Sequence, residues 1–218
     1  MAAERILIVD DTPVSLKVSQ ILLSREGYEV RTAATAEAAL EILHGFRPQV
    51  ILTDVQLPGI DGFELARRLK RDAGNRDILV VAVTATATPE GERQALEAGC
   101  DGYLPKRIED LVPRIHAYLG TAGARPIVLP DFQPLRERFL AEIGQAVAQW
   151  LDDLEGELDA KSASCIVHQW AGTAGLLGCA EVGRLAREME ATLRERPLDM
   201  AQLRDSFTSL AGGLVEPK

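Results

Sequence analysis

Acidic side chains follow two short apolar segments in the first half of the 218-residue chain. Asp10 and Asp11 come directly after the segment 6–9, and Asp54 comes directly after the segment 50–53. Three carboxylates held close together repel one another, so a site built from them needs a cation. Hard oxygen ligands in this number suit Mg²⁺ or Mn²⁺. The sequence therefore predicts a divalent metal site.

Two further polar residues end the later apolar segments. Thr84 closes the segment 78–84, and Lys106 follows the segment 102–104. A lysine can pair with phosphate oxygens, a threonine hydroxyl can donate a hydrogen bond to one of them, and an aspartate beside a metal can act as the nucleophile. Together with the carboxylates, these residues supply what phosphoryl transfer needs.

Short apolar runs alternate with helix-length amphipathic stretches over residues 1–119. This α/β pattern is typical of parallel strands that are buried on both faces and joined by crossover helices. Five strands are expected, at 6–9, 28–32, 50–53, 78–84 and 102–104. Five helices are expected, at 13–26, 36–43, 62–71, 90–98 and 108–119. Because loops converge at the carboxyl ends of parallel strands, this order brings the polar residues into one pocket.

Helix capping is the structural alternative for some of these carboxylates. Asp10 and Asp11 could serve only to cap the helix that begins at Pro13, since proline suits the first helical turn. Capping does not explain polar residues at successive strand ends, so we favour the functional interpretation of the whole set. Asp61 differs, because with Gly62 it is expected to form only a cap and a turn.

Four strings of the first half carry a family resemblance: ILIVDDTP, ILTDVQLPGIDGFEL, VVAVTA and YLPK, in this order. Over residues 4–119 they resemble the response-regulator receiver domain, which has a flavodoxin-like, doubly wound (βα)₅ fold. The resemblance implies that Asp54 accepts a phosphoryl group. It also implies that Asp11, Asp54 and the backbone carbonyl of Gln56 bind Mg²⁺, while Asp10 holds a metal-bound water.

The same resemblance assigns roles to three residues near the last two strands. Lys106 is expected to pair with the phosphoryl group, and Thr84 and Tyr103 are expected to move together as a switch. A tyrosine on a terminal strand is as often a core residue, so that alternative stays open for Tyr103. Arg107 stands where the family usually has a proline, so the peptide bond after Lys106 is expected to be trans or the loop strained.

Strand signals vanish from about residue 120, where glycine and proline become frequent. Residues 121–133 are predicted to be a linker between one domain at 1–120 and a second at 134–218. Apolar residues then recur every three or four positions in three runs, which begin at Leu135, Val182 and Leu203. With the segment around His168 they offer at least four amphipathic helices, which a four-helix bundle buries economically.

His168 is the histidine of this second domain, and two glycines accompany it at helical spacing. Gly172, Gly175 and Cys179 are expected to share its face of the helix. The opposite, core-facing stripe is expected to comprise Ile166, Trp170, Thr173 and Leu177. Each glycine within a helix costs about 1 kcal/mol relative to alanine, so we interpret the pair as clearance for a phosphoaspartate that approaches the nucleophilic imidazole. The alternative is a partly exposed histidine without chemistry.

The run from His168 to Gly178 resembles the histidine phosphotransfer (HPt) domain, whose histidine helix has a pattern like His-x-x-Lys-Gly-Ser-Ala-x-x-Leu-Gly. The resemblance continues through CAEVGRLAREME and covers about residues 132–214. It implies a four-helix bundle in which His168 carries a phosphoryl group. Ala171 stands where the family commonly has a lysine that helps to neutralise the arriving group. Transfer would then be slower, or a partner would supply the charge.

Composition restricts the partners and the compartment. The chain has 24 Lys and Arg against 33 Asp and Glu, a formal charge of −9, which disfavours binding to nucleic acid or an anionic membrane. Cys100, Cys165 and Cys179 lack metal-ligand spacing and are odd in number, which indicates free thiols in the reducing cytoplasm. The apolar run near the N-terminus is too short for a signal peptide or a membrane span, so no membrane insertion is expected.

These features predict a bacterial two-component phosphorelay protein. A sensor histidine kinase would phosphorylate Asp54, and His168 would relay phosphoryl groups to or from a response-regulator receiver, in cis or in trans. Without a glycine-rich ATP loop, the chain is not expected to be an enzyme that phosphorylates itself. One alternative is a phosphorylation-switched binding module or phosphate sink in which His168 is not phosphorylated. An aspartyl-phosphate phosphatase is disfavoured, because such enzymes share an Asp-x-Asp loop.

Overall fold

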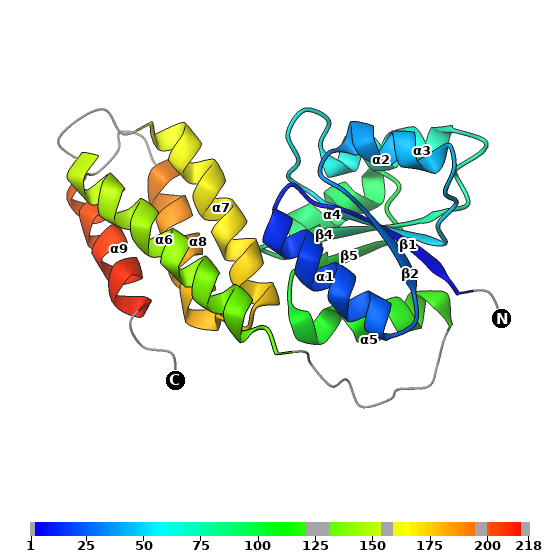
Figure 1. Ribbon diagram of the computed structural model, residues 1–218. Coiled ribbons are helices and arrows are strands. Elements are labelled where there is room, and N and C mark those ends of the chain that lie inside the picture. The colour runs from blue at the N-terminus through cyan, green and yellow to red at the C-terminus, as the bar shows by residue number, and fades with distance from the viewer. Residues whose placement is uncertain (1–2, 121–130, 154–158, 195–199, 215–218) are drawn as a thin grey trace. The chain divides into compact units, whose positions relative to one another are not determined.

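The computed structural model describes residues 3–120, 131–153, 159–194 and 200–214 (Figure 1). The chain divides into two compact units, Met1–Pro130 and Asp131–Lys218. The predicted linker at 121–133 lies mostly outside the described residues, so the predicted domain limits stay predictions. Within the described ranges, no helix combines the length and the apolar character needed to cross a membrane.

The first unit is a parallel sheet of five strands with helices on both faces (Figure 1). The strands are β1 (Arg5–Val9), β2 (Glu29–Ala33), β3 (Val50–Asp54), β4 (Leu79–Thr84) and β5 (Gly102–Pro105). The helices are α1 (Pro13–Arg25), α2 (Ala36–Leu43), α3 (Gly62–Arg71), α4 (Pro89–Glu97) and α5 (Ile108–Leu119). The strand order is β2-β1-β3-β4-β5. The predicted doubly wound (βα)₅ fold is therefore confirmed.

The register of the sheet aligns the carboxyl ends of the central strands. Val9 at the end of β1 pairs with Thr53, and Asp54 at the end of β3 pairs with Val83. All five residues of β3 are buried, as expected of a central strand covered by helices on both faces. The polar residues that end these strands therefore emerge at one edge of the sheet.

Helix starts agree with the capping expectations. Asp61 caps α3 by accepting a hydrogen bond from the backbone N–H of Glu64 at 2.7 Å, which confirms the predicted cap. Gly62 follows it at a place where an added Cβ would lie only 2.0 Å from the backbone oxygen of Asp54. Helix α1 begins at Pro13 with Thr12 in the capping position, so Asp10 and Asp11 are not its N-cap.

The described part of the second unit consists of four helices: α6 (Gln133–Asp153), α7 (Ala160–Leu176), α8 (Ala180–Arg194) and α9 (Met200–Gly213). They pack side by side as a bundle (Figure 1). Trp150 stacks on Trp170 with ring centroids 5.1 Å apart, and Phe207 lies 5.6 Å from the Trp150 ring. These contacts join α6, α7 and α9 in one core, as the bundle prediction required.

The predicted core stripe of α7 was wrong in one respect. Ile166 is 38% exposed, whereas the buried stripe comprises Ala163, Val167, Trp170 and Ala174. The small alanines of this stripe allow α8 to approach α7 closely, so the stripe is fully packed. Because alanine side chains are small, the stripe is only weakly apolar in the sequence. Thr173 is buried there, and its hydroxyl has no hydrogen-bond partner among the described residues.

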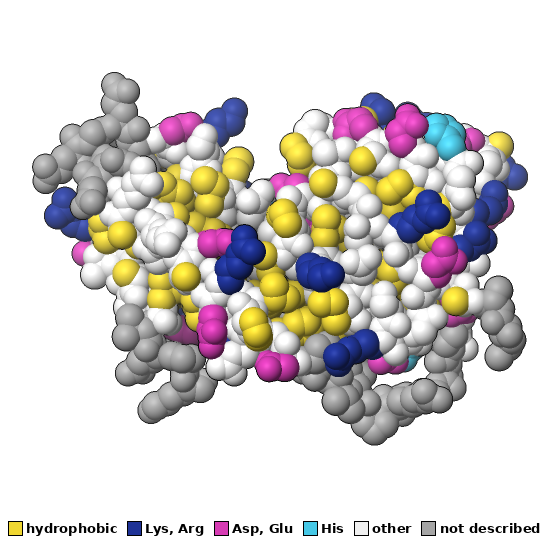
Figure 2. All heavy atoms as spheres, in the orientation of Figure 1, with side chains coloured by type: hydrophobic (Ala, Val, Ile, Leu, Met, Phe, Trp, Pro, Cys, Tyr) yellow, Lys and Arg dark blue, Asp and Glu magenta, His cyan; other side chains and the backbone are white. Residues whose placement is uncertain are grey.

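Charged side chains are mixed on the molecular surface. On the face drawn in Figure 2, the lysines and arginines of the described residues are scattered among aspartates and glutamates and do not form one basic patch. This distribution is compatible with the acidic formal charge of −9.

Candidate functional site

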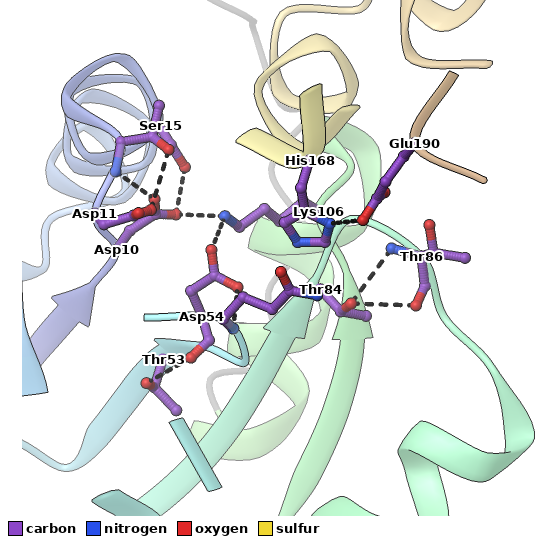
Figure 3. Close-up of polar contacts among 12 residues, drawn as sticks. Asp10, Asp11, Ser15, Thr53, Asp54, Thr84, Thr86, Lys106, His168 and Glu190 are labelled. Carbon is purple, nitrogen blue, oxygen red and sulfur yellow. Dashed lines mark hydrogen bonds and ion pairs between the residues drawn. The ribbon is translucent and has the colours of Figure 1, made fainter. Parts of the chain in front are cut away.

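Three of the predicted site residues are buried together at the carboxyl ends of the strands (Figure 3). Asp10 follows β1, Asp54 ends β3 and Lys106 follows β5. Buried charges are costly unless each has a partner of opposite sign or a hydrogen bond. The contacts of these three side chains therefore decide what the pocket can do.

Lys106 joins the two buried aspartates. Its Nζ lies 2.8 Å from Oδ2 of Asp10 and also donates to Oδ2 of Asp54. Burial by itself would lower the pKa of Lys106, but the two ion pairs outweigh burial and raise it. The ammonium group is therefore charged, and it faces a carboxylate oxygen of each aspartate.

Local hydrogen bonds also hold both aspartates in place. The Ser15 hydroxyl donates to Oδ2 of Asp10 at 2.5 Å, and the backbone N–H of Thr12 donates to Oδ1 at 2.9 Å. The backbone N–H of Gln56 donates to Oδ1 of Asp54 at 3.1 Å. Sequence reasoning missed Ser15, although its place in the first turn of α1 puts it near the end of β1.

Three carboxylates converge in this pocket. Burial raises the pKa of Asp54, Asp10 raises it further, and Lys106 opposes both effects. Asp10, Asp11 and Asp54 each offer an oxygen, and these oxygens lie within 4.8 Å of one another. Asp10 and Asp54 share the ammonium group of Lys106, and the three carboxylates form a donor set of hard oxygens. These residues fit a divalent cation such as Mg²⁺.

Thr84 and Tyr103 are linked through the loop that follows β4. The Thr84 hydroxyl donates to the backbone oxygen of Thr86 at 3.1 Å, and the Tyr103 hydroxyl donates to the same oxygen at 3.3 Å. Gly91 of α4 packs over this tyrosine, since an added Cβ would lie 2.3 Å from the phenol oxygen. The two predicted switch residues thus share one hydrogen-bond acceptor.

His168 of α7 pairs with a residue that the sequence did not single out. Its Nδ1 lies 3.0 Å from Oε1 of Glu190 on α8, and both side chains are largely buried (Figure 3). Arg194 donates to the same glutamate oxygen at 2.5 Å. A carboxylate only accepts hydrogen bonds, so Nδ1 carries the proton and the lone pair of the imidazole is on Nε2. This tautomer makes Nε2 the nucleophilic nitrogen.

The residues expected beside His168 are only partly on its helix. Gly172 and Gly175 lie in α7, one and two turns after the histidine, whereas Cys179 lies beyond α7 and just before α8. The prediction of Cys179 on the histidine face of the helix was therefore wrong. The chain turns at Gly178, where a backbone φ of 70° ends the helical path.

Family models match both units. The response regulator receiver domain model matches residues 6–116, and the Hpt domain model matches residues 134–213. These matches confirm the two resemblances that the sequence strings carried.

Curated relatives match the first unit. The polar-differentiation response regulator DivK of Brucella anthropi is 37% identical over 121 residues, which are 54% of this chain and 97% of that protein. The phosphate regulon transcriptional regulatory protein PhoB of Pseudomonas aeruginosa is 38% identical over 125 residues, which are 56% of this chain. The match spans only 55% of PhoB and 24% of the response regulator PleD of Caulobacter vibrioides.

Solved structures show the same fold for the first unit. A response regulator structure from Chloroflexus aurantiacus is 32% identical, with a TM-score of 0.52, and the match covers 55% of this chain and 99% of that chain. The receiver domain of a sensor histidine kinase from Pseudomonas aeruginosa is 30% identical, with a TM-score of 0.50 and coverage of 55% and 99%. That structure contains a magnesium ion coordinated in its active-site cleft.

Proposed function

We propose that this chain, which belongs to the response regulator receiver family and also carries an Hpt domain, relays phosphoryl groups through Asp54 and His168. The two domains are parts of a two-component phosphorelay. A sensor histidine kinase would donate the phosphoryl group to Asp54, and a receiver domain would exchange it with His168. The cytoplasm is the proposed location, because such kinases present their phosphohistidine there.

One observation carries the proposal for the first unit: Asp54 and Lys106 are buried in direct contact at the strand ends. In the proposed step, a carboxylate oxygen of Asp54 attacks the phosphorus of a phosphohistidine, the P–N bond breaks and an acyl phosphate forms. Lys106 then pairs with the phosphoryl oxygens as the negative charge moves onto them.

A divalent cation fits the same pocket. The side chains of Asp10, Asp11 and Asp54 and the backbone carbonyl of Gln56 would hold Mg²⁺, with Mn²⁺ as the alternative. When bound, the cation neutralises phosphoryl oxygens during transfer. The magnesium ion in the Pseudomonas aeruginosa receiver structure supports this choice. Asp10 also anchors Lys106, so it positions the ammonium group besides taking part in the acidic cluster.

Phosphorylation would be sensed through the shared acceptor on Thr86. The Thr84 hydroxyl would turn from the Thr86 oxygen toward the new phosphoryl group. Once the Thr84 hydrogen bond to the Thr86 oxygen is broken, the Tyr103 hydroxyl would be the remaining donor to that oxygen. The loop and the tyrosine would then move together. This coupling supports the switch role expected for the two residues.

At His168 the proposed step is attack by Nε2 on the phosphorus of an aspartyl phosphate. The P–O bond to the aspartate breaks and the aspartate leaves as a carboxylate. The ring then carries a positive charge, which the carboxyl group of Glu190 stabilises through the proton held at Nδ1. The reverse step returns the phosphoryl group to a receiver aspartate, so the site can serve flow in either direction.

The different chemical stabilities of aspartyl phosphate and phosphohistidine provide the test. Full-length wild type, Asp54→Asn and His168→Ala are incubated with a phosphorylated sensor kinase and an acceptor receiver. Asp54→Asn should lose the base-labile acyl phosphate, and His168→Ala should lose the acid-labile phosphohistidine together with transfer to the acceptor. If His168→Ala passes on as much phosphate as wild type, the relay is excluded in favour of a phosphorylation-switched binding module.

A further inference from the structure

Three arginines lie on α8, the helix that contacts His168 through Glu190, and two of them are bound to carboxylates. Arg184 donates to both Glu181 and Glu188 at 2.5 Å, and Arg194 donates to Glu190 at 2.5 Å. Arg187, in contrast, makes no ion pair with any residue that the structure describes. A half-buried guanidinium without a carboxylate partner is free to bind an incoming anion.

The position of Arg187 follows from helical spacing. Gly183, Arg187, Glu190 and Arg194 recur at intervals of four, three and four residues, which places them on one face of α8. Glu190 contacts His168 from this face. Arg187 therefore lies on the same side of α8 as the glutamate that holds the imidazole.

Gly183 locates the guanidinium of Arg187 more closely. A Cβ added at Gly183 would lie 3.4 Å from Nη1 of Arg187 and 3.6 Å from the backbone oxygen of Ala171. The same point lies 3.4 Å from the Ala174 Cβ, so it falls in the groove between α7 and α8. The guanidinium therefore lies beside Ala171, one turn of α7 beyond His168. The absence of a side chain at Gly183 leaves room for it.

We infer that Arg187 binds the phosphoryl group on Nε2 of His168 and supplies the positive charge that a lysine at position 171 would otherwise provide. This inference rests on the proposed phosphorylation of His168. A guanidinium stays protonated at every relevant pH, and its fork of N–H donors matches the oxygens of a phosphoryl group. Arg194 is less suited, because the carboxylate of Glu190 already binds its charge. In this inference, the positive charge that binds the phosphoryl group therefore comes from the same chain as His168.

The test uses the full-length Asp54→Asn chain, so that His168 is the phosphoacceptor under study, with phosphoramidate as the phosphoryl donor. Adding Arg187→Ala should slow the appearance of acid-labile phosphate on the order of tenfold, the range typical of losing a charge-assisted hydrogen bond in the transition state. Arg187→Lys should recover most of the rate. Arg184→Ala, which removes a paired arginine from the same helix, is the matched control and should react like the parent.

A spectroscopic readout separates charge from folding. The ³¹P resonance of the phosphohistidine should titrate at higher pH in Arg187→Ala than in the Arg184→Ala control, because loss of a nearby cation favours protonation of the phosphoryl group. Equal rates and equal titrations in these two variants would overturn the inference. Failure of the Asp54→Asn parent to gain any acid-labile phosphate would instead contradict the proposed role of His168, and this inference with it.

Discussion

The Nδ1 atom of His168 lies 3.0 Å from Oε1 of Glu190, across the interface between α7 and α8. This contact fixes both the tautomer and the plane of the imidazole. Glu190 is buried and also binds Arg194, so its carboxylate is held in place. In the proposed transfer, the pair would present Nε2 for in-line attack without a rearrangement of the ring.

Replacing Glu190 should slow phosphoryl transfer to His168. We expect Glu190→Ala to reduce the rate about tenfold, because the imidazolium formed on attack loses its counter-charge and the ring loses its orientation. Glu190→Gln should be affected less, since its amide oxygen still accepts from Nδ1. Rates are measured in the Asp54→Asn chain with phosphoramidate as donor.

Glu188→Ala is the matched control for this prediction. Glu188 also lies on α8, and its carboxylate binds Arg184 rather than His168. Equal rates for Glu190→Ala and Glu188→Ala would show that the contact at Nδ1 has no role in transfer.

The raised pKa of Asp54 predicts a pH-dependent gain in stability for Asp54→Asn in EDTA. The folded state binds the Asp54 proton more tightly than the unfolded state, whose carboxyl has a pKa near 3.8. As pH rises above that value, ionisation of Asp54 therefore costs wild type folding free energy, and Asn removes the cost. At pH 7 we expect Asp54→Asn to raise the thermal midpoint of the first unit.

Two further measurements constrain this prediction. The difference between Asp54→Asn and wild type should shrink as the pH falls well below 3.8, where Asp54 becomes protonated in both states. Added Mg²⁺ should raise the midpoint of wild type more than that of Asp54→Asn, because the carboxylate is a ligand in the proposed metal site. A pH-independent difference would contradict the electrostatic explanation.

Removing Lys106 should destabilise the first unit. Lys106→Ala leaves Asp10 and Asp54 buried without their shared cation, which we expect to cost about 3 kcal/mol in EDTA. Mg²⁺ should recover part of the loss. The control is Lys70→Ala, which breaks a more exposed pair with Asp101 and should cost about 1 kcal/mol or less. Urea unfolding followed by circular dichroism compares the two variants.

The sequence predicted the first unit well because its signals are local. The strands β1, β3 and β4 are apolar runs with a polar residue at or directly after the end, and parallel order then brings Asp10, Asp54 and Lys106 to one edge. Ser15 was missed because its contact with Asp10 depends on the angle between the end of β1 and the start of α1. The pattern of neighbouring residues in the sequence does not specify this angle.

The second unit was less predictable because its contacts depend on helix packing. Glu190 was missed because its contact with His168 requires the specific register of α8 against α7, which the left-handed turn at Gly178 sets. Ile166 was predicted to lie in the core stripe because large apolar residues contribute most to a periodic hydrophobic pattern. The buried face instead includes the small residue Ala163. Small residues at a close helix interface carry little hydrophobic signal.

Cysteine reactivity should follow burial. Burial raises the pKa of Cys100 to about 11, whereas Cys165 is exposed. At pH 8 only roughly one Cys100 thiol in a thousand is ionised, and the thiolate is the reactive form. Iodoacetamide should therefore alkylate Cys165 at least a hundredfold faster than Cys100, as mass spectrometry of peptides will show. Comparable rates in the folded protein would mean that the site of Cys100 opens readily.

Tryptophan fluorescence should report the second unit, because it contains both tryptophans of the sequence: Trp170 is buried, and the half-buried Trp150 stacks on it. Phe207 is fully buried against Trp150, so Phe207→Ala opens a cavity and should destabilise the bundle by about 3 to 5 kcal/mol. Its urea midpoint by fluorescence should fall. The matched control is Phe46→Ala, which removes a buried phenyl ring from the core of the first unit. Because each unit has its own core, this control should leave the fluorescence transition in place, and an equal shift in both variants would show that the two cores unfold together.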